Sequence, residues 1–282
     1  MKNKKLLFIF SAILLVILNV NIGFAQRIAA GGYHSLALCY DGTAKAWGYN
    51  TLGQLGDGST GVNSSSPVST VTISSIKSIA AGGSMSMAIV TGGNVWAWGY
   101  NDSYQIGDST NITRFSPVQV HGPGGIGFLN GISSVAVSSG NIHALALKSD
   151  STVWAWGFNF NGECGDSTHD TKKTPVQVHG AGNVGFLKGI ISISAGGGCS
   201  LALKYDSTVL AWGSGYGWTP VKVNGLTGII AISAGLALKY DGSVWAWGYN
   251  GHGQLGDSTT VDRSTPAEIE IMPLRKPTFP AP

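Results

Sequence analysis

Short apolar runs recur along the chain, and glycine-rich turns separate them. Within a run, the type of apolar residue alternates from one position to the next. Residues 95–98 read Val-Trp-Ala-Trp, so in an extended strand Trp96 and Trp98 lie on one face while Val95 and Ala97 lie on the other. Because both faces are apolar, we expect neighbours to cover the sheet on both sides. Pairs of Asp-Gly or Gly-Gly stand where a two-residue hairpin turn needs positive φ, at residues 41–42, 92–93 and 241–242.

A repeat anchored by a Trp-Gly pair runs through the chain. The pair occurs at residues 47–48, 98–99, 156–157, 212–213 and 247–248. A turn-rich stretch of the type Gly-Gln-Leu-Gly-Asp follows four of the five anchors, at residues 53–57, 104–108, 162–166 and 253–257. A Ser-Pro or Thr-Pro step and a short alternating run come next.

Each repeat unit predicts four short strands. The Pro-Val-x-Val run is the first, a segment that ends at paired glycines the second, Leu-Ala-Leu the third and Val-Trp-Ala-Trp the fourth. Proline is tolerated at the first position of a strand. Four strands a unit, stacked face to face, predict an all-β fold: a β-propeller of four-stranded blades with about five repeats.

The repeat resembles a known family. Paired glycines, His-Ser-x-Ala-Leu, Asp-Gly, Val-x-x-Trp-Gly and Asn-x-x-Gly-Gln-Leu-Gly-Asp are similar to the regulator of chromosome condensation repeat, over residues 28–271. The resemblance implies a β-propeller, usually of seven blades, whose members include exchange factors for small GTPases and a secreted inhibitor of β-lactamases. This chain departs from it in having five copies, with the fourth truncated between Gly213 and Pro220 and the fifth shortened before Leu236.

The order of the predicted strands bears on ring closure. The first repeat contains only the second, third and fourth strands of a unit. The last predicted strand, at residues 266–271, is the first strand of a unit. We therefore expect the C-terminal strand to complete the first blade and close a monomeric ring. The alternative is an open arc, or one closed by a second chain as a dimer, and an open arc would expose apolar blade faces.

The N-terminal residues form the three-part pattern of a secretory signal peptide. Three lysines among the first five residues precede an apolar run at 6–18, and Gly23 and Ala25 stand before a predicted cut at Gln26. The run is shorter than the ~20 residues that span a bilayer, which argues against a membrane anchor. We expect a signal peptide at 1–25, a propeller at 26–272 and a Pro-rich tail at 273–282. The chain would then be a secreted, bacterial-type family member, periplasmic or at the cell surface, with no membrane span after cleavage.

Charge and candidate chemistry narrow the function classes. The chain has 17 basic and 14 acidic residues, and losing the three leader lysines balances them. Nucleic-acid binding needs a basic footprint, so we do not expect it. The odd number of cysteines favours free, mostly buried thiols at Cys39, Cys164 and Cys199 over a disulfide framework or zinc site.

Other chemically suggestive residues have structural interpretations. His34 and His143 recur where other copies carry Met85 or Cys199, which favours core histidines hydrogen-bonded to backbone. The G-x-G-x-x-G stretches at 122–127 and 180–185 lack a following long helix, so we interpret them as hairpin turns and expect no cofactor. The aspartate that ends each turn-rich stretch is expected to cap an Asx turn.

A partner-binding surface is expected where the copies differ, because the shared residues build the fold. The candidates are Tyr104, His169, Lys172, Lys173, Tyr216 and Trp218. The sequence thus predicts a secreted, non-enzymatic propeller that binds an unidentified protein or surface polymer. Two alternatives stay open: an inhibitor of an extracellular enzyme, and a propeller enzyme with an active site at the ring axis.

Overall fold

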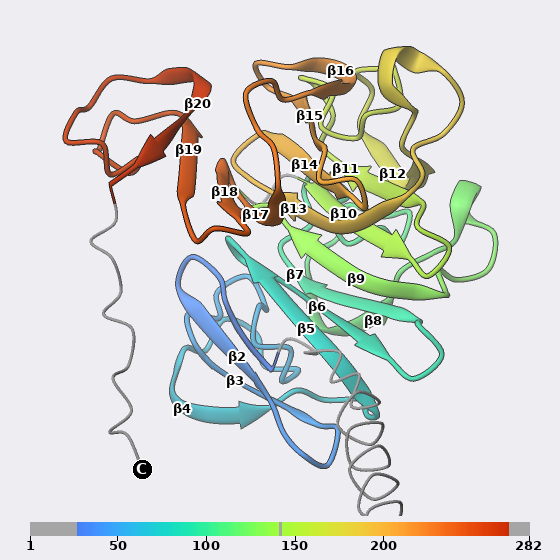
Figure 1. The fold of residues 1–282 in the computed structure, drawn as a ribbon. Coiled ribbons are helices and arrows are strands. Elements are labelled where there is room, and N and C mark those ends of the chain that lie inside the picture. Colours follow the sequence, from blue (N-terminus) through green and yellow to red (C-terminus); the bar gives the residue numbers. More distant parts are fainter. Residues whose placement is uncertain (1–26, 141–142, 271–282) are drawn as a thin grey trace, which may run out of the picture.

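Five four-stranded antiparallel sheets follow one another along the chain in the computed structural model, which describes residues 27–140 and 143–270 (Figure 1). Sheet 1 holds β1 (Ile28–Ala30), β2 (His34–Leu38), β3 (Ala44–Gly48) and β4 (Ser64–Ser69). Sheet 2 holds β5 (Ile76–Gly82), β6 (Met85–Val90), β7 (Val95–Gly99) and β8 (Arg114–Gln119). Sheet 3 holds β9 (Ile132–Val137), β10 (His143–Lys148), β11 (Val153–Gly157) and β12 (Lys172–Gln177).

The remaining two sheets have the same order. Sheet 4 holds β13 (Ile190–Ala195), β14 (Cys199–Lys204), β15 (Val209–Gly213) and β16 (Gly217–Lys222), and sheet 5 holds β17 (Ile229–Ser233), β18 (Leu236–Lys239), β19 (Val244–Gly248) and β20 (Arg263–Ile269). The all-β fold of four-stranded blades is therefore confirmed. The predicted signal peptide at 1–25 and the tail at 273–282 lie outside the described residues. No helix in the described part of the chain is long and apolar enough to cross a membrane.

Local chemistry accounts for the hairpins. Gly42 adopts φ +78° in the turn between β2 and β3, a conformation in which a Cβ is disfavoured. Thr43 donates from its backbone N–H and its hydroxyl to one oxygen of Asp41, at 2.9 and 2.7 Å. The alternating strand behaves as predicted, because Trp98 on one face and Val95 on the other are both fully buried. Both faces of an internal sheet thus contact neighbouring sheets.

The Pro-Val strand occupies a different place from the one predicted. It is the fourth and outermost strand of its own sheet: β8 pairs with β7, with Ala97 opposite Val118. Each sheet is thus built from one continuous segment, and pairing across a short loop costs less chain entropy than pairing across a distant one. The last strand, β20, pairs with β19, so the predicted closing strand in the first blade is not formed.

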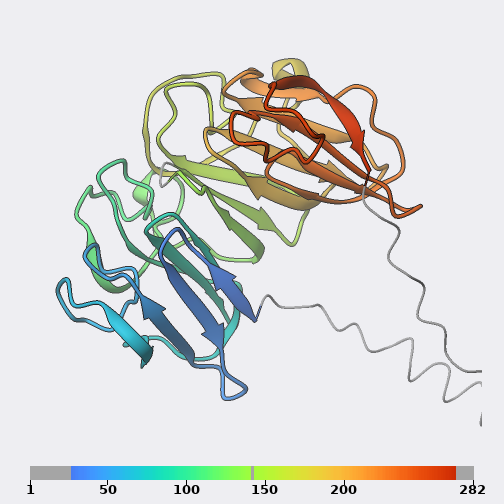
Figure 2. The same ribbon diagram turned by 90° about the vertical axis from the view of Figure 1, so that its left-hand side faces the viewer.

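The sheets form an open arc, which is the alternative that the sequence left. The innermost strands contact one another in the order β1, β5, β9, β13 and β17, and so lie along the inside of the arc. Figures 1 and 2 show sheet 1 in blue at one end of the row and sheet 5 in red at the other. No strand of sheet 5 pairs with sheet 1 within residues 27–140 and 143–270.

Candidate functional site

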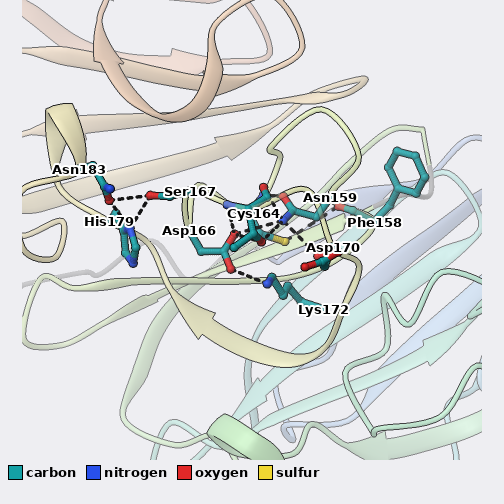
Figure 3. Close-up of polar contacts among 10 residues, drawn as sticks. Phe158, Asn159, Cys164, Asp166, Ser167, Asp170, Lys172, His179 and Asn183 are labelled. Carbon is teal, nitrogen blue, oxygen red and sulfur yellow. Dashed lines mark hydrogen bonds and ion pairs between the residues drawn. The ribbon is translucent and has the colours of Figure 1, made fainter.

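The loop after four of the five Trp-Gly anchors is held by one buried asparagine. In sheet 3 the side-chain oxygen of Asn159 accepts the backbone N–H of Cys164 at 2.8 Å, and its amide donates to Asp166 and to the carbonyls of Thr168 and Asp170, each at 3.1 Å (Figure 3). The same arrangement recurs at Asn50, Asn101 and Asn250. Sequence reasoning quoted this asparagine in the motif but missed its role. Its signal was the fixed spacing to the aspartate seven residues later.

The aspartate at the end of the loop has two roles in sheets 2, 3 and 5. One oxygen of Asp166 accepts the backbone N–H and hydroxyl of Thr168, at 3.3 and 2.8 Å, which confirms the predicted Asx turn. The other oxygen pairs with the Lys172 ammonium at 2.6 Å. Burial raises the pKa of Asp166, but the hydrogen bonds from Lys172 and Thr168 outweigh it and hold that pKa below its ordinary value. Arg114 and Arg263 play the part of Lys172 in sheets 2 and 5.

The ion pair places Lys172, one of the predicted partner-binding residues, inside the fold. Its side chain is mostly buried, and it bridges the loop to the start of β12. The neighbouring Lys173 points to another sheet instead. Its ammonium lies over the Tyr104 ring, 5.2 Å from the centroid, and its carbonyl accepts the backbone N–H of Ser109 at 3.2 Å. The structure thus brings Tyr104 and Lys173 together at the junction of sheets 2 and 3.

His169 and Trp218 form the corresponding pair at the next junction. Their ring centroids are 5.2 Å apart, and the Trp218 carbonyl accepts the backbone N–H of Ser167 at 3.1 Å. Trp218 keeps 52% of its surface exposed at the start of β16, so it remains available to a partner. Both pairs occupy one structural position, where the loop of one sheet reaches the outermost strand of the next.

Tyr216 lies apart from these pairs. It is half-buried beside a cleft of about 560 Å³ between sheets 4 and 5, lined also by Cys199 and Trp247. Tyr216 packs against the cluster that contains Trp247. Burial raises the pKa of Tyr216, and the Trp247 side chain acts on that pKa in the opposite direction. In the first three copies, the Gly-Gln-Leu-Gly-Asp stretch contacts the tryptophan of the next sheet. The fourth copy lacks this stretch, and we attribute its contact with the next tryptophan to Tyr216.

Two equivalent loops expose apolar side chains that sequence reasoning did not single out. They contain the short 3-10 turns η1 (Pro123–Gly125) and η2 (Ala181–Asn183), which agrees with the interpretation of both stretches as turns. Ile126 is 82% and Val184 is 78% exposed. η1 contacts β12 and η2 contacts β16, so the two loops lie over the outermost strands of the following sheets. The signal in the sequence was an apolar residue repeated inside two glycine loops.

Each loop also carries an exposed phenylalanine. Phe128 packs against His121, with centroids 5.8 Å apart, and Phe186 packs against His179 at 5.7 Å. We define the outer loop surface as five exposed apolar side chains on sheets 2 to 4. These are Ile126, Phe128, Val184, Phe186 and Trp218.

The recurring histidines lie between sheets. His34 Nε2 lies 2.8 Å from the Ser86 hydroxyl of sheet 2, and His143 Nε2 lies 2.8 Å from the Ser200 hydroxyl of sheet 4. The prediction of core histidines is confirmed, but the partner at Nε2 is a serine of the next sheet and not backbone. Burial lowers the pKa of His34 to about 4 and that of His143 to about 3. Both rings are therefore neutral at physiological pH.

The three cysteines and the acidic side chains are the remaining candidates for chemistry in the described residues. Cys39, Cys164 and Cys199 are free, with Cys164 buried and the other two half-buried. Burial raises the pKa of the Cys164 and Cys199 thiols. Within the same residues, no group of three or more His, Cys, Asp or Glu side chains could hold a metal ion.

Comparison with known proteins decides the family. A family model described as "RCC1-like domain" matches residues 16–279. The chain belongs to the RCC1-like family. This RCC1-like chain is 30% identical to the human E3 ubiquitin-protein ligase HERC2 over 261 residues, which cover 84% of the chain and 5% of HERC2. It is 28% identical over 222 residues to the mitochondrial RCC1 domain-containing protein RUG3 of Arabidopsis thaliana, covering 72% of the chain and 47% of RUG3.

Solved RCC1-like structures share the fold. Human WBSCR16 superposes with a TM-score of 0.74 at 22% identity, covering 87% of this chain and 67% of that one. Prp20p of Saccharomyces cerevisiae superposes with a TM-score of 0.66 at 19% identity, covering 87% and 76%. The RCC1-like chain described here therefore spans about half or less of the two curated relatives named above, and part of each solved propeller.

Proposed function

We propose that this RCC1-like chain is an exported, non-enzymatic scaffold that binds another protein through its outer loop surface. The observation that carries the proposal is the pair of exposed apolar loop residues, Ile126 and Val184, at equivalent places on neighbouring sheets. Clustered exposed apolar side chains are typical of protein-binding sites, and aromatic residues often supply most of the binding energy. Trp218 would be the aromatic anchor beside them.

The backbone of these loops supports a preorganised binding surface. Gly122 N–H donates to the Gly127 carbonyl at 3.0 Å, and Gly180 N–H donates to the Gly185 carbonyl at 2.9 Å. Each loop is thereby closed on itself, so little conformational freedom is lost when a partner binds. By contrast, the exposed tyrosines Tyr205 and Tyr240 stand singly at hairpin turns, where isolated apolar surface is ordinary.

The relatives are consistent with a protein-binding role. Prp20p has been described with its binding to Gsp1p and histones, and yeast RCC1 (Prp20) has been seen bound to Kap60. Export is a separate part of the proposal and is supported by the signal-peptide pattern at residues 1–25. An exported chain would meet other partners, so an extracellular or surface-attached protein is the class we propose.

The binding part is tested by cross-linking the purified chain to intact cells of its source. We expect a captured protein to be lost with a Val184→Ser/Trp218→Ala double variant. The matched control is Tyr240→Ala, which removes a still more exposed aromatic side chain from a hairpin turn and should retain capture. Retention by the double variant would exclude the outer loop surface as the binding site. If the captured protein is an enzyme, its activity with and without the chain tests whether binding inhibits it.

The export part has its own measurement. N-terminal mass analysis of the chain recovered outside the cytoplasm should begin at Gln26. Recovery of the intact leader in the cytoplasmic fraction alone would contradict export while leaving the binding surface untouched.

A further inference from the structure

One contact recurs at successive junctions between sheets. The backbone carbonyl of Gln54 in sheet 1 accepts the indole N–H of Trp98 at 3.0 Å and the hydroxyl of Ser86 at 2.8 Å, both from sheet 2. At the junction of sheets 3 and 4, the Glu163 carbonyl accepts Trp212 at 2.8 Å and Ser200 at 2.9 Å. The serine and tryptophan are cross-strand neighbours, so they reach the same carbonyl from one face.

A glycine two residues after that carbonyl makes room for the indole. An ideal Cβ on Gly56 would lie 2.6 Å from the Trp98 indole nitrogen. The same atom on Gly107 or Gly165 would lie 2.7 or 2.8 Å from the indole nitrogen of Trp156 or Trp212. These distances are too short for a side chain, so the glycine is part of a socket for the tryptophan of the next sheet.

Sheet 5 presents this socket without a tryptophan in it. Its loop is built like the others, because Asn250 accepts the Leu255 N–H at 2.9 Å and Gly256 donates to the Gly253 carbonyl at 3.1 Å. Among the residues that the structure describes, only Ile269, at 3.6 Å, lies within 4 Å of an ideal Cβ on Gly256. Gln254 is exposed, whereas Gln54 and its equivalents in sheets 2 and 3 are fully buried.

Sheet 1 presents the complementary half. Ser35 and Trp47 are cross-strand neighbours, as Ser86 and Trp98 are in sheet 2. Trp47 is only half-buried, and its indole nitrogen has no hydrogen-bond acceptor in the part of the chain that the structure describes. On the same face Ile28 is 75% exposed, although its equivalent in sheet 2, Ile79, is fully buried. This end of the arc therefore has a tryptophan without a socket.

We propose that the outward face of sheet 1 docks on the outward face of sheet 5 of a second copy of this chain. The Trp47 indole and the Ser35 hydroxyl would then donate to the Gln254 carbonyl, with the indole over Gly256. A second copy is the occupant because sheet 1 and sheet 5 of one chain lie apart across the opening of the arc (Figures 1 and 2). The contact continues an interface that the chain already uses internally, and it covers apolar surface that would otherwise meet water.

This contact joins two different surfaces, the face of sheet 1 and the face of sheet 5. Each open assembly therefore still has one free socket at one end and one free tryptophan at the other. Assemblies of this kind close into rings where the rotation between copies permits and otherwise grow as open helices. Light scattering on the purified chain should therefore give a molar mass that rises with concentration above that of one chain. A mass of one chain at every concentration would overturn the proposal, whether the arc closes on itself or stays open.

Two single variants remove the contact from opposite sides. Trp47→Ala removes the indole, and Gly256→Ala places a methyl group in the socket. Each variant alone should have the mass of one chain. Mixed in equal amounts they should form a dimer and nothing larger, because the socket of the first and the tryptophan of the second are intact. Self-association that survives in either variant, or a mixture that does not dimerise, would overturn the head-to-tail arrangement.

Backbone strain at Gly256 needs a matched control. Gly256 has φ +71° and Gly182 has φ +67°, and a Cβ on Gly182 would meet no atom within 4 Å. Gly182→Ala therefore introduces similar strain far from both end faces and should leave self-association unchanged. Loss of self-association in Gly182→Ala would show that strain alone abolishes it and would overturn the assignment of Gly256. Circular dichroism verifies that each variant retains its sheets.

Discussion

The indole N–H of Trp98 in sheet 2 is satisfied by the backbone carbonyl of Gln54 in sheet 1, at 3.0 Å. The donor and the acceptor belong to different sheets, so neither sheet completes this contact by itself. Trp156 and Trp212 make the same contact with the preceding sheet, at 2.7 and 2.8 Å. The stability of the arc therefore depends on contacts between nearest neighbours, as in other repeat proteins.

Trp98→Phe should lower the free energy of unfolding by about 2–3 kcal/mol, because it removes a buried hydrogen bond and leaves a cavity. Trp47→Phe is the matched control. Trp47 is half-buried and has no such hydrogen bond within the described residues, so the same change there should cost less than about 1 kcal/mol. Denaturant unfolding of dilute protein measures both. Equal losses would contradict the role of the indole N–H.

Stability should fall in acid before the aspartates titrate. His34 is buried as a neutral ring with a pKa lowered to about 4, whereas in the unfolded chain it titrates near the ordinary histidine pKa of 6.5. Below pH 6.5 the unfolded state binds a proton that the folded state does not. The free energy of unfolding is thus maximal above that pH and falls by roughly 3 kcal/mol on His34's account as the pH approaches 4. Unfolding measured across this window checks the slope.

The chain supplies the control for this pH dependence. His34 and His143 each face a serine of the next sheet. At the junction of sheets 2 and 3, Met85 occupies the position of the histidine and Ala144 occupies the position of the serine. His34→Met/Ser86→Ala copies that apolar pair. The variant should lose part of the slope between pH 6.5 and 4 and keep the slope from His143. An unchanged slope would mean that His34 is not the titrating group.

Asn159→Ala should destabilise the loop of sheet 3, because Asn159 is a fully buried side chain that holds the loop together. The substitution removes hydrogen bonds to Cys164, Asp166, Thr168 and Asp170, so we expect a cost of about 2–4 kcal/mol. Limited proteolysis within residues 160–170 should accelerate at the same time. Asn161→Ala, which removes an exposed side chain bonded to Glu163, is the comparison variant and should change neither measurement strongly.

The three thiols should differ in reactivity. Cys164 is buried and its pKa is raised, so the reactive thiolate form is rare and inaccessible. A short exposure of the native chain to iodoacetamide should leave Cys164 unmodified, and denaturation should make all three cysteines react. Mass analysis of the peptides checks this. Modification of Cys164 as fast as Cys39 in the native chain would contradict its burial.

The parts of the fold that were predicted correctly depend on short stretches of chain. The alternation at residues 95–98 and the Asp41-Gly42 turn specify strands and hairpins locally, and both are as predicted. The Pro-Val strand was assigned to the wrong side of its unit, because period-two patterning shows that a segment is a strand but not which neighbour it pairs with.

The partner-binding role of the candidate residues stays a prediction, but the structure shows how those residues are grouped. Variation between copies indicated Tyr104, Lys173, His169 and Trp218, and the structure joins these as two pairs at neighbouring junctions. Variation alone could not show that Lys172 is held by Asp166, because a charged residue in a loop looks the same whether it pairs internally or faces solvent. Nor could it separate the exposed Ile126 and Val184 from apolar residues that pack inward.

The amino-acid sequence by itself determined that this chain builds repeated four-stranded sheets with indoles between them, because strand alternation, turn glycines and the Trp-Gly anchor act within a few residues of one another. Only the tertiary structure decided that the five sheets stop short of a ring. Whether the ends of a row of sheets meet depends on how each sheet is inclined to the next, and that angle is a property of packed surfaces rather than of any local motif.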